Sequence, residues 1–162
     1  LICSDFIINL INNHKKLKMQ TPGDDFMSLQ QKAAHYLNRR IRKYEFTGIE
    51  ELLHSDYAID GRVSDTGMSA LSLACSLGEK TEAHKPYNQK LVNTILKYNP
   101  DVNQKDDWGR TPLHLACNSG NLTAVKTLIA VGVSSNDEPM AHTLDLNAQS
   151  LGGETPLMKA CQ

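Results

Sequence analysis

The chain has 162 residues, of which 40% are hydrophobic and 22% charged, and its formal net charge is −1. This composition predicts one globular domain or a short repeat array. The apolar run 1–11 is interrupted by polar residues and is too short to span a bilayer. It also lacks the charged start and the small-residue cleavage site of a secretory signal peptide. These features exclude a membrane span and a signal peptide within that run.

Residues 1–24 precede the first helical pattern, and a break at 21–25 separates them from it. They are predicted to be a disordered tail or leader sequence, with an amphipathic partner-binding segment as the alternative. We expect the chain to be part of a longer protein, because it does not begin with Met and its last residues lie within a helical pattern.

Residues 25–46 predict a long helix, and residues 48–60 predict a second helix followed by a turn. The basic run 38–43 lies in the first of these. On a helix its cations spread around the circumference, while Leu37 and Ile41 share the apolar side. A solvated helix face is therefore favoured over a nuclear-import signal or a nucleic-acid contact, for which no aromatic stacking residues are interleaved.

Three stretches, 65–78, 107–120 and 151–162, share one pattern headed by Gly67, Gly109 and Gly153. The glycines are separated by 42 and 44 residues. Removing nine residues at 79–87 and eleven at 134–144 leaves a unit of 33 residues in both cases. The regular period indicates a repeat array with two inserts, each predicted to be a solvated loop.

Within the middle unit, Thr111 is a predicted helix N-cap, and Gly120 a predicted stop signal. Asn121 is predicted to cap a second helix, which Gly132 should end in a left-handed conformation. Asn99 takes the position of Gly132 in the preceding unit, and Asn is the next best residue for such a cap.

The 33-residue unit, with Thr-Pro-Leu-His at 111–114, Leu-Ala at 115–116 and Asp-Val-Asn at 101–103, resembles the ankyrin repeat. The resemblance implies an all-α helical solenoid of helix–loop–helix units with short β-hairpin fingers, used to bind other proteins. The outer units lack the Thr–His pair, so their turns are expected to be looser. The expected organisation is a degenerate capping repeat at 25–64, a repeat with its insert 79–87 at 65–106, a repeat with its insert 134–144 at 107–150, and the start of a truncated repeat at 151–162.

Neither catalysis nor a metal site is predicted. Cys75, Cys117 and Cys161 occupy one repeated position, and stacked helices lie about 8–10 Å apart. That spacing is too wide for a disulfide or a shared zinc ion, so buried reduced thiols are expected. His114 most resembles a catalytic histidine, but no acid is placed to orient it, and the resemblance implies that it ties the turn to Thr111. No cofactor-binding motif is present.

The predicted function is protein–protein interaction through the finger tips and the concave helix face. Trp108, the single Trp of the chain, is the favoured anchor; a lid over a neighbouring finger is the alternative. Asp65, Asp106, Asp107 and Glu154 should make this side acidic and favour a basic partner segment. The predicted partner-binding residues are Asp65, Thr66, Asp107, Trp108, Arg110, Asn118, Ser119, Leu151 and Glu154.

An alternative function is that of a regulatory or targeting array in a larger enzyme or channel. The resemblance also makes Asn103 a candidate for hydroxylation, with Asn147 a weaker one. No nucleic acid and no membrane contact are expected, and free cysteines favour the cytoplasm, with the nucleus as the alternative.

Overall fold

The structure is a computed structural model that describes residues 25–46, 48–53, 61–79, 81–133 and 143–162. Within them every regular element is a helix and none is a strand. The helices are α2 (Asp25–Arg42), α3 (Ile49–Leu53), α4 (Ala70–Cys75), α5 (His84–Leu96), α6 (Pro112–Ser119), α7 (Leu122–Val133) and α8 (Pro156–Ala160). The all-α prediction is confirmed.

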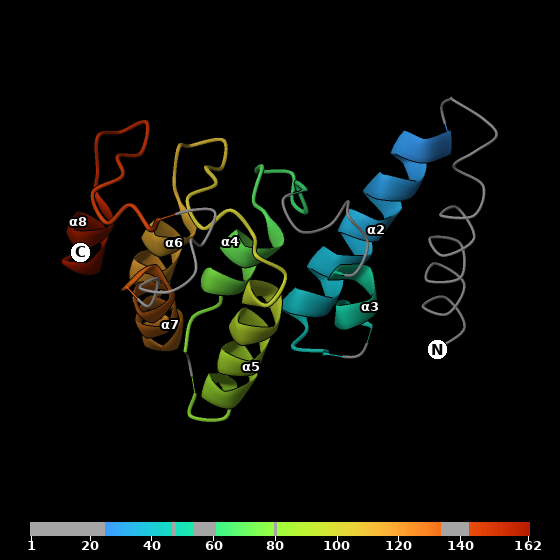
Figure 1. Cartoon of the computed structure of the whole chain (residues 1–162), viewed down its shortest axis with the longest axis horizontal. Coiled ribbons are helices and arrows are strands. Elements are labelled where there is room, and N and C mark those ends of the chain that lie inside the picture. Colours follow the sequence, from blue (N-terminus) through green and yellow to red (C-terminus); the bar gives the residue numbers. More distant parts are fainter. Residues whose placement is uncertain (1–24, 47, 54–60, 80, 134–142) are drawn as a thin grey trace.

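The helices form successive pairs, α2/α3, α4/α5 and α6/α7, that stack along the long axis of the molecule and end at α8 (Figure 1). The loops that precede α4, α6 and α8 project together from one edge of this stack (Figure 1). These three loops are the predicted fingers, and in the described residues each is a turn rather than a β-hairpin with strands.

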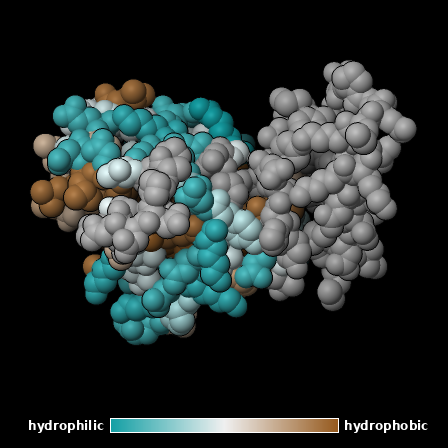
Figure 2. All heavy atoms as spheres, viewed as in Figure 1, coloured by the Kyte–Doolittle hydropathy of each residue, from teal (hydrophilic) through white to brown (hydrophobic). Residues whose placement is uncertain are grey.

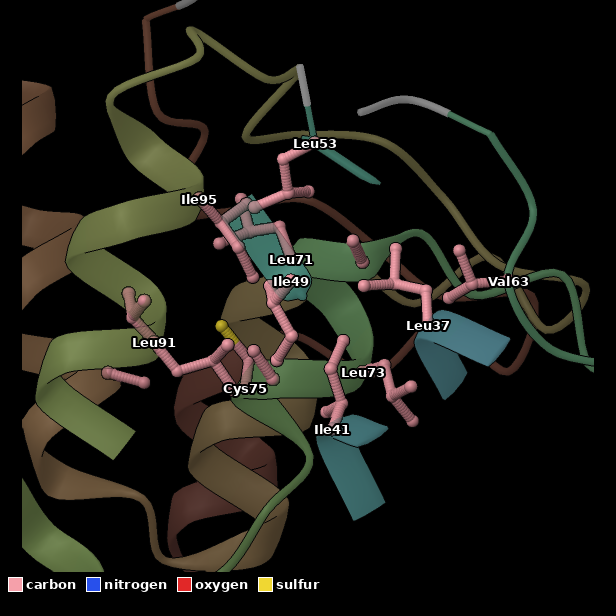
Figure 3. Packing of buried hydrophobic residues seen from close by; sticks show 14 of the residues in the cluster. Leu37, Ile41, Ile49, Leu53, Val63, Leu71, Leu73, Cys75, Leu91 and Ile95 are labelled. Atoms are coloured by element: carbon pink, nitrogen blue, oxygen red, sulfur yellow. The ribbon is translucent and has the colours of Figure 1, made fainter. Parts of the chain in front are cut away.

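One apolar core runs through all three helix pairs. Leu37 and Ile41 of α2, Ile49 of α3 and Leu71 of α4 are all fully buried. Figure 3 shows Ile49 and Leu71 beside Ile95 of α5, and Leu37 beside Val63. Burying one such side chain contributes about 1.5–3 kcal/mol relative to leaving it exposed. α2 packs against α3 and α4, and Arg39, Arg42 and Lys43 of the basic run are exposed, as expected. That 25–64 is a capping repeat stays a prediction, because residues 47 and 54–60 lie outside the described part of the chain.

Local capping chemistry sets the ends of α6 and α7. Thr111 is the N-cap of α6, with extended backbone angles, and Gly120 ends this helix with a φ of 66°. The side-chain oxygen of Asn121 accepts the Ala124 N–H at 3.0 Å, while its amide nitrogen donates to the Leu77 carbonyl at 2.8 Å. Asn121 therefore caps its own helix and fastens it to the preceding repeat, which confirms its predicted role.

The prediction for Gly132 is wrong, whereas that for Asn99 is confirmed. Asn99 has a left-handed φ of 51° after the end of α5. Gly132 instead lies inside α7. A Cβ atom added at Gly132 would meet the Cβ atom of Leu144 at 2.7 Å. Glycine is required there for the close approach of a neighbouring segment, not for a left-handed turn.

The first insert is only partly a loop, because α5 begins at His84. The ring of His84 stacks on Tyr44, with 4.3 Å between the ring centroids. Tyr87 packs edge-to-face against both Tyr44 and Phe46. The end of this insert therefore docks on the residues that follow α2, contrary to the prediction of a solvated loop. The predicted tail 1–24 and most of the second insert, 134–142, lie outside the described residues.

Candidate functional site

The three finger tips are four-residue turns at 64–67, 106–109 and 150–153. Each turn ends in a glycine with a φ of 72° or 75°, in the left-handed region. The N–H of each glycine donates to the carbonyl of the first turn residue at 2.9–3.1 Å. The repeated Gly67, Gly109 and Gly153 of the sequence are explained by this geometry, because other residues adopt such a φ at a cost.

Adjacent tips are joined through their backbones. The Asp107 N–H donates to the Thr66 carbonyl at 3.2 Å, and the Leu151 N–H donates to the Trp108 carbonyl at 2.8 Å. The three tips therefore form one connected surface, here called the tip row, made of residues 64–67, 106–109 and 150–153. Because these bonds hold the backbone, a partner would meet a surface that is already ordered.

Trp108 rests on a side chain of its own finger, a placement that neither predicted alternative described. The guanidinium carbon of Arg110 lies 4.5 Å from the centroid of the indole ring. Arg110 is in turn held by the Asp106 carboxylate, with N–O distances of 2.7 and 2.8 Å. The indole remains 48% exposed, and Leu151 on the next tip is 80% exposed. The tip row thus presents two adjacent apolar side chains on a fixed base.

The predicted acidic character of this side is largely wrong. Asp106 is buried, so it does not contribute to the surface. Asp107 forms an ion pair with Arg62 at 2.6 Å, and Glu154 forms one with Lys159 at 2.7 Å. Hydrogen bonds from Lys159 and Gln162 hold the pKa of Glu154 below its ordinary value. Sequence reasoning missed Arg62, whose partner lies 45 residues further along the chain and leaves no local signal.

Four predicted site residues lie outside the tip row: Arg110 and Glu154 directly follow two of its turns, and Asn118 and Ser119 lie further away. Asn118 and Ser119 lie in the last turn of α6, and the helix starts beside the tip turn, so they are about 10 Å from it along the axis. Asn118 is exposed there. The Ser119 hydroxyl donates to the Cys75 carbonyl at 3.0 Å, which links the two stacked repeats. At the first tip, the predicted site residue Asp65 is exposed. The neighbouring Thr66 is half-buried, and its hydroxyl lies 2.9 Å from the Ser64 hydroxyl.

His114 is fully engaged inside the stack. Its Nδ1 accepts the backbone N–H of Thr111 at 3.2 Å and lies 2.9 Å from the Thr111 hydroxyl. Its Nε2 lies 2.9 Å from the Glu154 carbonyl oxygen. Neither ring nitrogen is left to take a proton from a substrate. Among the described residues, no group of three or more His, Cys, Asp or Glu side chains is arranged to hold a metal ion.

Asn103, the candidate hydroxylation site, joins two fingers. Its amide nitrogen donates to the Thr143 carbonyl at 2.7 Å, and its oxygen accepts the Asp145 N–H at 2.8 Å. The side chain is half-buried, so an enzyme would need this junction to open first. Asn147 is exposed, and its N–H donates to the Asp145 carboxylate at 2.9 Å. Modification of Asn103 stays a prediction.

Hydrophobic atoms gather at the C-terminal end of the visible face, over α8 and the finger beside it (Figure 2). The most exposed large apolar side chains there are Leu151, Leu157 and Met158. Of the helices in the described part of the chain, none is both long and apolar enough to cross a bilayer.

Comparison with known proteins supports the repeat assignment. A family model described as ankyrin repeats, in three copies, matches residues 80–162, just over half of the chain. The mouse protein phosphatase 1 regulatory subunit 27 is 37% identical over 54 residues, which cover 32% of this chain and 35% of that protein. The human palmitoyltransferase ZDHHC13 is 37% identical over 81 residues, covering 49% of this chain and 11% of that protein.

An Arabidopsis thaliana ADP-ribosylation factor GTPase-activating protein, AGD4, is 33% identical over 72 residues, covering 44% of this chain and 8% of that protein. The matched stretches thus span about a third or less of each of these relatives. These relatives are named for different activities, so the sequence similarity between them and this chain concerns the repeats and not a shared activity. Because the family model matches the residues that build the stack from the first insert onward, the chain belongs to the ankyrin-repeat family.

Proposed function

We propose that this chain binds a partner protein through the tip row, with Trp108 as the anchor. The observation that carries the proposal is the exposed indole of Trp108 beside the exposed Leu151, both on backbone-linked turns. A large aromatic side chain is the type most often found at the energetic centre of an interface. Since the core is complete without Trp108, the fold places no demand on a Trp at this position.

We further propose that the partner contributes an apolar pocket for Trp108 and Leu151. Of the four predicted acidic residues, Asp65 is the one that is exposed and forms no ion pair in the described part of the chain. It alone therefore supports a basic partner segment. The proposal includes no cofactor and no catalytic role, and the commitment of both His114 nitrogens to structural bonds supports the latter. The free thiols of Cys75, Cys117 and Cys161 support a reducing compartment, the cytoplasm or alternatively the nucleus.

The alternative function is a regulatory or targeting array within a larger enzyme or channel. The match to part of a palmitoyltransferase supports this alternative, and the match to part of a phosphatase regulatory subunit supports a separate binding subunit. The full-length sequence distinguishes them, because a catalytic or membrane pattern beyond residue 162 would identify the array as part of an enzyme or channel.

The test is a quantitative pull-down with the full chain and its Trp108→Ala variant, followed by titration of each captured protein after purification. We expect Trp108→Ala to weaken the complex by about 2 kcal/mol, or roughly 30-fold in Kd. The melting temperature should stay nearly unchanged, because the indole packs on Arg110 at the surface.

The matched control is Leu122→Ala, which removes another exposed apolar side chain, on α7 and away from the tips. It should leave binding unchanged. The proposal fails if the two variants bind a purified partner as well as the wild type does. It also fails if Trp108→Ala lowers the melting temperature strongly, because the residue would then be a packing element.

A further inference from the structure

A groove lies between α2 and the first finger, on the α2 end of the stack. Its volume is about 770 Å³, within the range of about 300–1,000 Å³ that is typical of ligand sites. The lining residues that carry the argument are Asn38, Arg39, Arg42, Arg62 and Asp65. The groove shares residues 64–66 with the first tip of the tip row, but Trp108 and Leu151, which carry the proposed function, are not among its lining residues.

The cations of the groove come from two elements. Arg39 and Arg42 lie on α2 at a spacing of three, which places them on one helix face. Arg62 approaches from the finger, where it also pairs with Asp107. The residues of α2 that are fully buried, Leu37 and Ile41, occupy the opposite positions. The helix therefore packs with one side and turns a basic side toward the groove.

Asn38 fixes this arrangement. Its amide nitrogen donates to the Val63 carbonyl of the finger at 2.7 Å. Its oxygen accepts the Arg42 Nε–H at 2.8 Å. Because Arg has five N–H donors in a planar fork, this bond leaves the two terminal nitrogens of Arg42 for a ligand. The Arg42 guanidinium is thereby oriented before anything binds.

The charge balance of the groove favours an anion. Among the described residues, Arg39 and Arg42 form no ion pair, Arg62 is already paired with Asp107, and Asp65 is the one carboxylate of the lining. By contrast, Arg40 on the same helix is paired with Glu45 at 2.8 Å and does not line the groove. Guanidinium groups bind carboxylates through two parallel charge-assisted hydrogen bonds. A ligand with several carboxylates would therefore be favoured over a neutral one.

We propose that this groove binds an extended acidic segment of a partner protein. The groove residues of α2 run from Ala34 to Arg42, about 12 Å along the helix axis, which is the length of three to four extended residues. Among the described residues of the lining there is no Phe, Tyr or Trp, so these residues offer no stacking platform of the kind that binds single-stranded nucleic acid. A partner segment with two acidic residues among three consecutive positions would therefore match the length and the charge of the groove.

The experiment measures fluorescence anisotropy of a fluorescein-labelled hexaglutamate peptide titrated with the full chain, alongside a hexaserine peptide and a labelled dT12 oligonucleotide. Binding of hexaglutamate and not of hexaserine is expected, and Arg39→Gln/Arg42→Gln should weaken it about tenfold or more. Asp65→Asn should strengthen it, since it removes the opposing carboxylate. Trp108→Ala should leave it unchanged, which separates this site from the proposed Trp108 anchor.

The matched control is Lys97→Gln/Lys126→Gln, which removes two exposed cations, one directly after α5 and one on α7. It should change the affinity less than twofold. The proposal is overturned if both double variants weaken binding equally, because the attraction would then come from net charge alone. It is also overturned if hexaglutamate does not bind, or if dT12 binds more tightly than hexaglutamate with the same dependence on Arg39 and Arg42.

Discussion

His114 and Glu154 join two successive repeats through one hydrogen bond, in which the imidazole Nε2 lies 2.9 Å from the carbonyl oxygen. The backbone N–H of Thr111 can only donate, so the Nδ1 that it contacts must accept. The ring proton is therefore on Nε2, which donates to Glu154. One neutral side chain thus closes its own turn and fastens the next finger.

Replacing His114 with Gln should destabilise the chain by about 1–3 kcal/mol, because buried donors and acceptors lose their partners. Thermal unfolding measures the loss. Met158 occupies the equivalent position of the next unit but is 55% exposed, so Met158→Gln is the matched control and should cost little. Equal losses in the two variants would contradict the role given to His114.

Gly132→Ala should destabilise the chain by about 1 kcal/mol. An Ala in a helix interior gains about 1 kcal/mol over Gly, but the contact with the Leu144 Cβ atom adds an overpacking cost of about 1–3 kcal/mol. In a Leu144→Gly background the contact disappears, so the same change should become stabilising. Denaturant unfolding of the four proteins in this double-mutant cycle tests the sign reversal. A loss of the same size in both backgrounds would point back to a left-handed Gly132.

Burial raises the pKa of Tyr87 to about 12 from an ordinary value of 10.0, with further contributions from Tyr44 and Glu45. The unfolded chain releases this proton at lower pH than the folded chain. The protonated Tyr87 side chain therefore makes its full contribution to the free energy of unfolding below pH 10, and this contribution is lost as the pH rises to about 12. Unfolding at several pH values should show this loss in the wild type.

Tyr87→Phe is the control for this pH dependence. Among the described residues the Tyr87 hydroxyl has no hydrogen-bond partner, so its removal should not lower the melting temperature at neutral pH. Absorbance at 295 nm should lose its latest phenol ionisation in the variant. If wild type and variant lose stability equally between pH 10 and 12, another group is responsible.

The three described cysteines should differ in reactivity. Cys75 is fully buried, and burial raises the pKa of its thiol; the pKa of the half-buried Cys117 is raised for the same reason. Cys161 is exposed. Because the thiolate is the reactive form, iodoacetamide at pH 8 should label Cys161 quickly and Cys75 only as the chain unfolds. Peptide mass spectrometry measures each site, and equal labelling rates in the native chain would contradict the packing of Cys75.

The sequence alone could predict the caps at Thr111 and Asn121 and the left-handed Asn99, because each depends on nearby residues. The repeat period could be predicted because three stretches of the sequence share one pattern. Gly132 could not, because the residue that restricts it, Leu144, lies beyond the second insert. The burial of Asp106 was missed for a related reason. Its carboxylate is occupied by the N–H groups of its own turn and by Arg110, which a charge count does not reveal.

The contact between His84 and Tyr44 has a consequence for how this array can be cut or recombined. Ideal repeats are interchangeable, because each meets the same surface on either side. Here the added residues of one unit stack on the predicted cap, with 4.3 Å between the rings. A chimera that received this unit without its cap would expose Tyr87 and leave His84 without its aromatic neighbour. Residues 25–96 should therefore be transplanted as a single piece, and substitutions at position 44 should be compensated at positions 84 and 87.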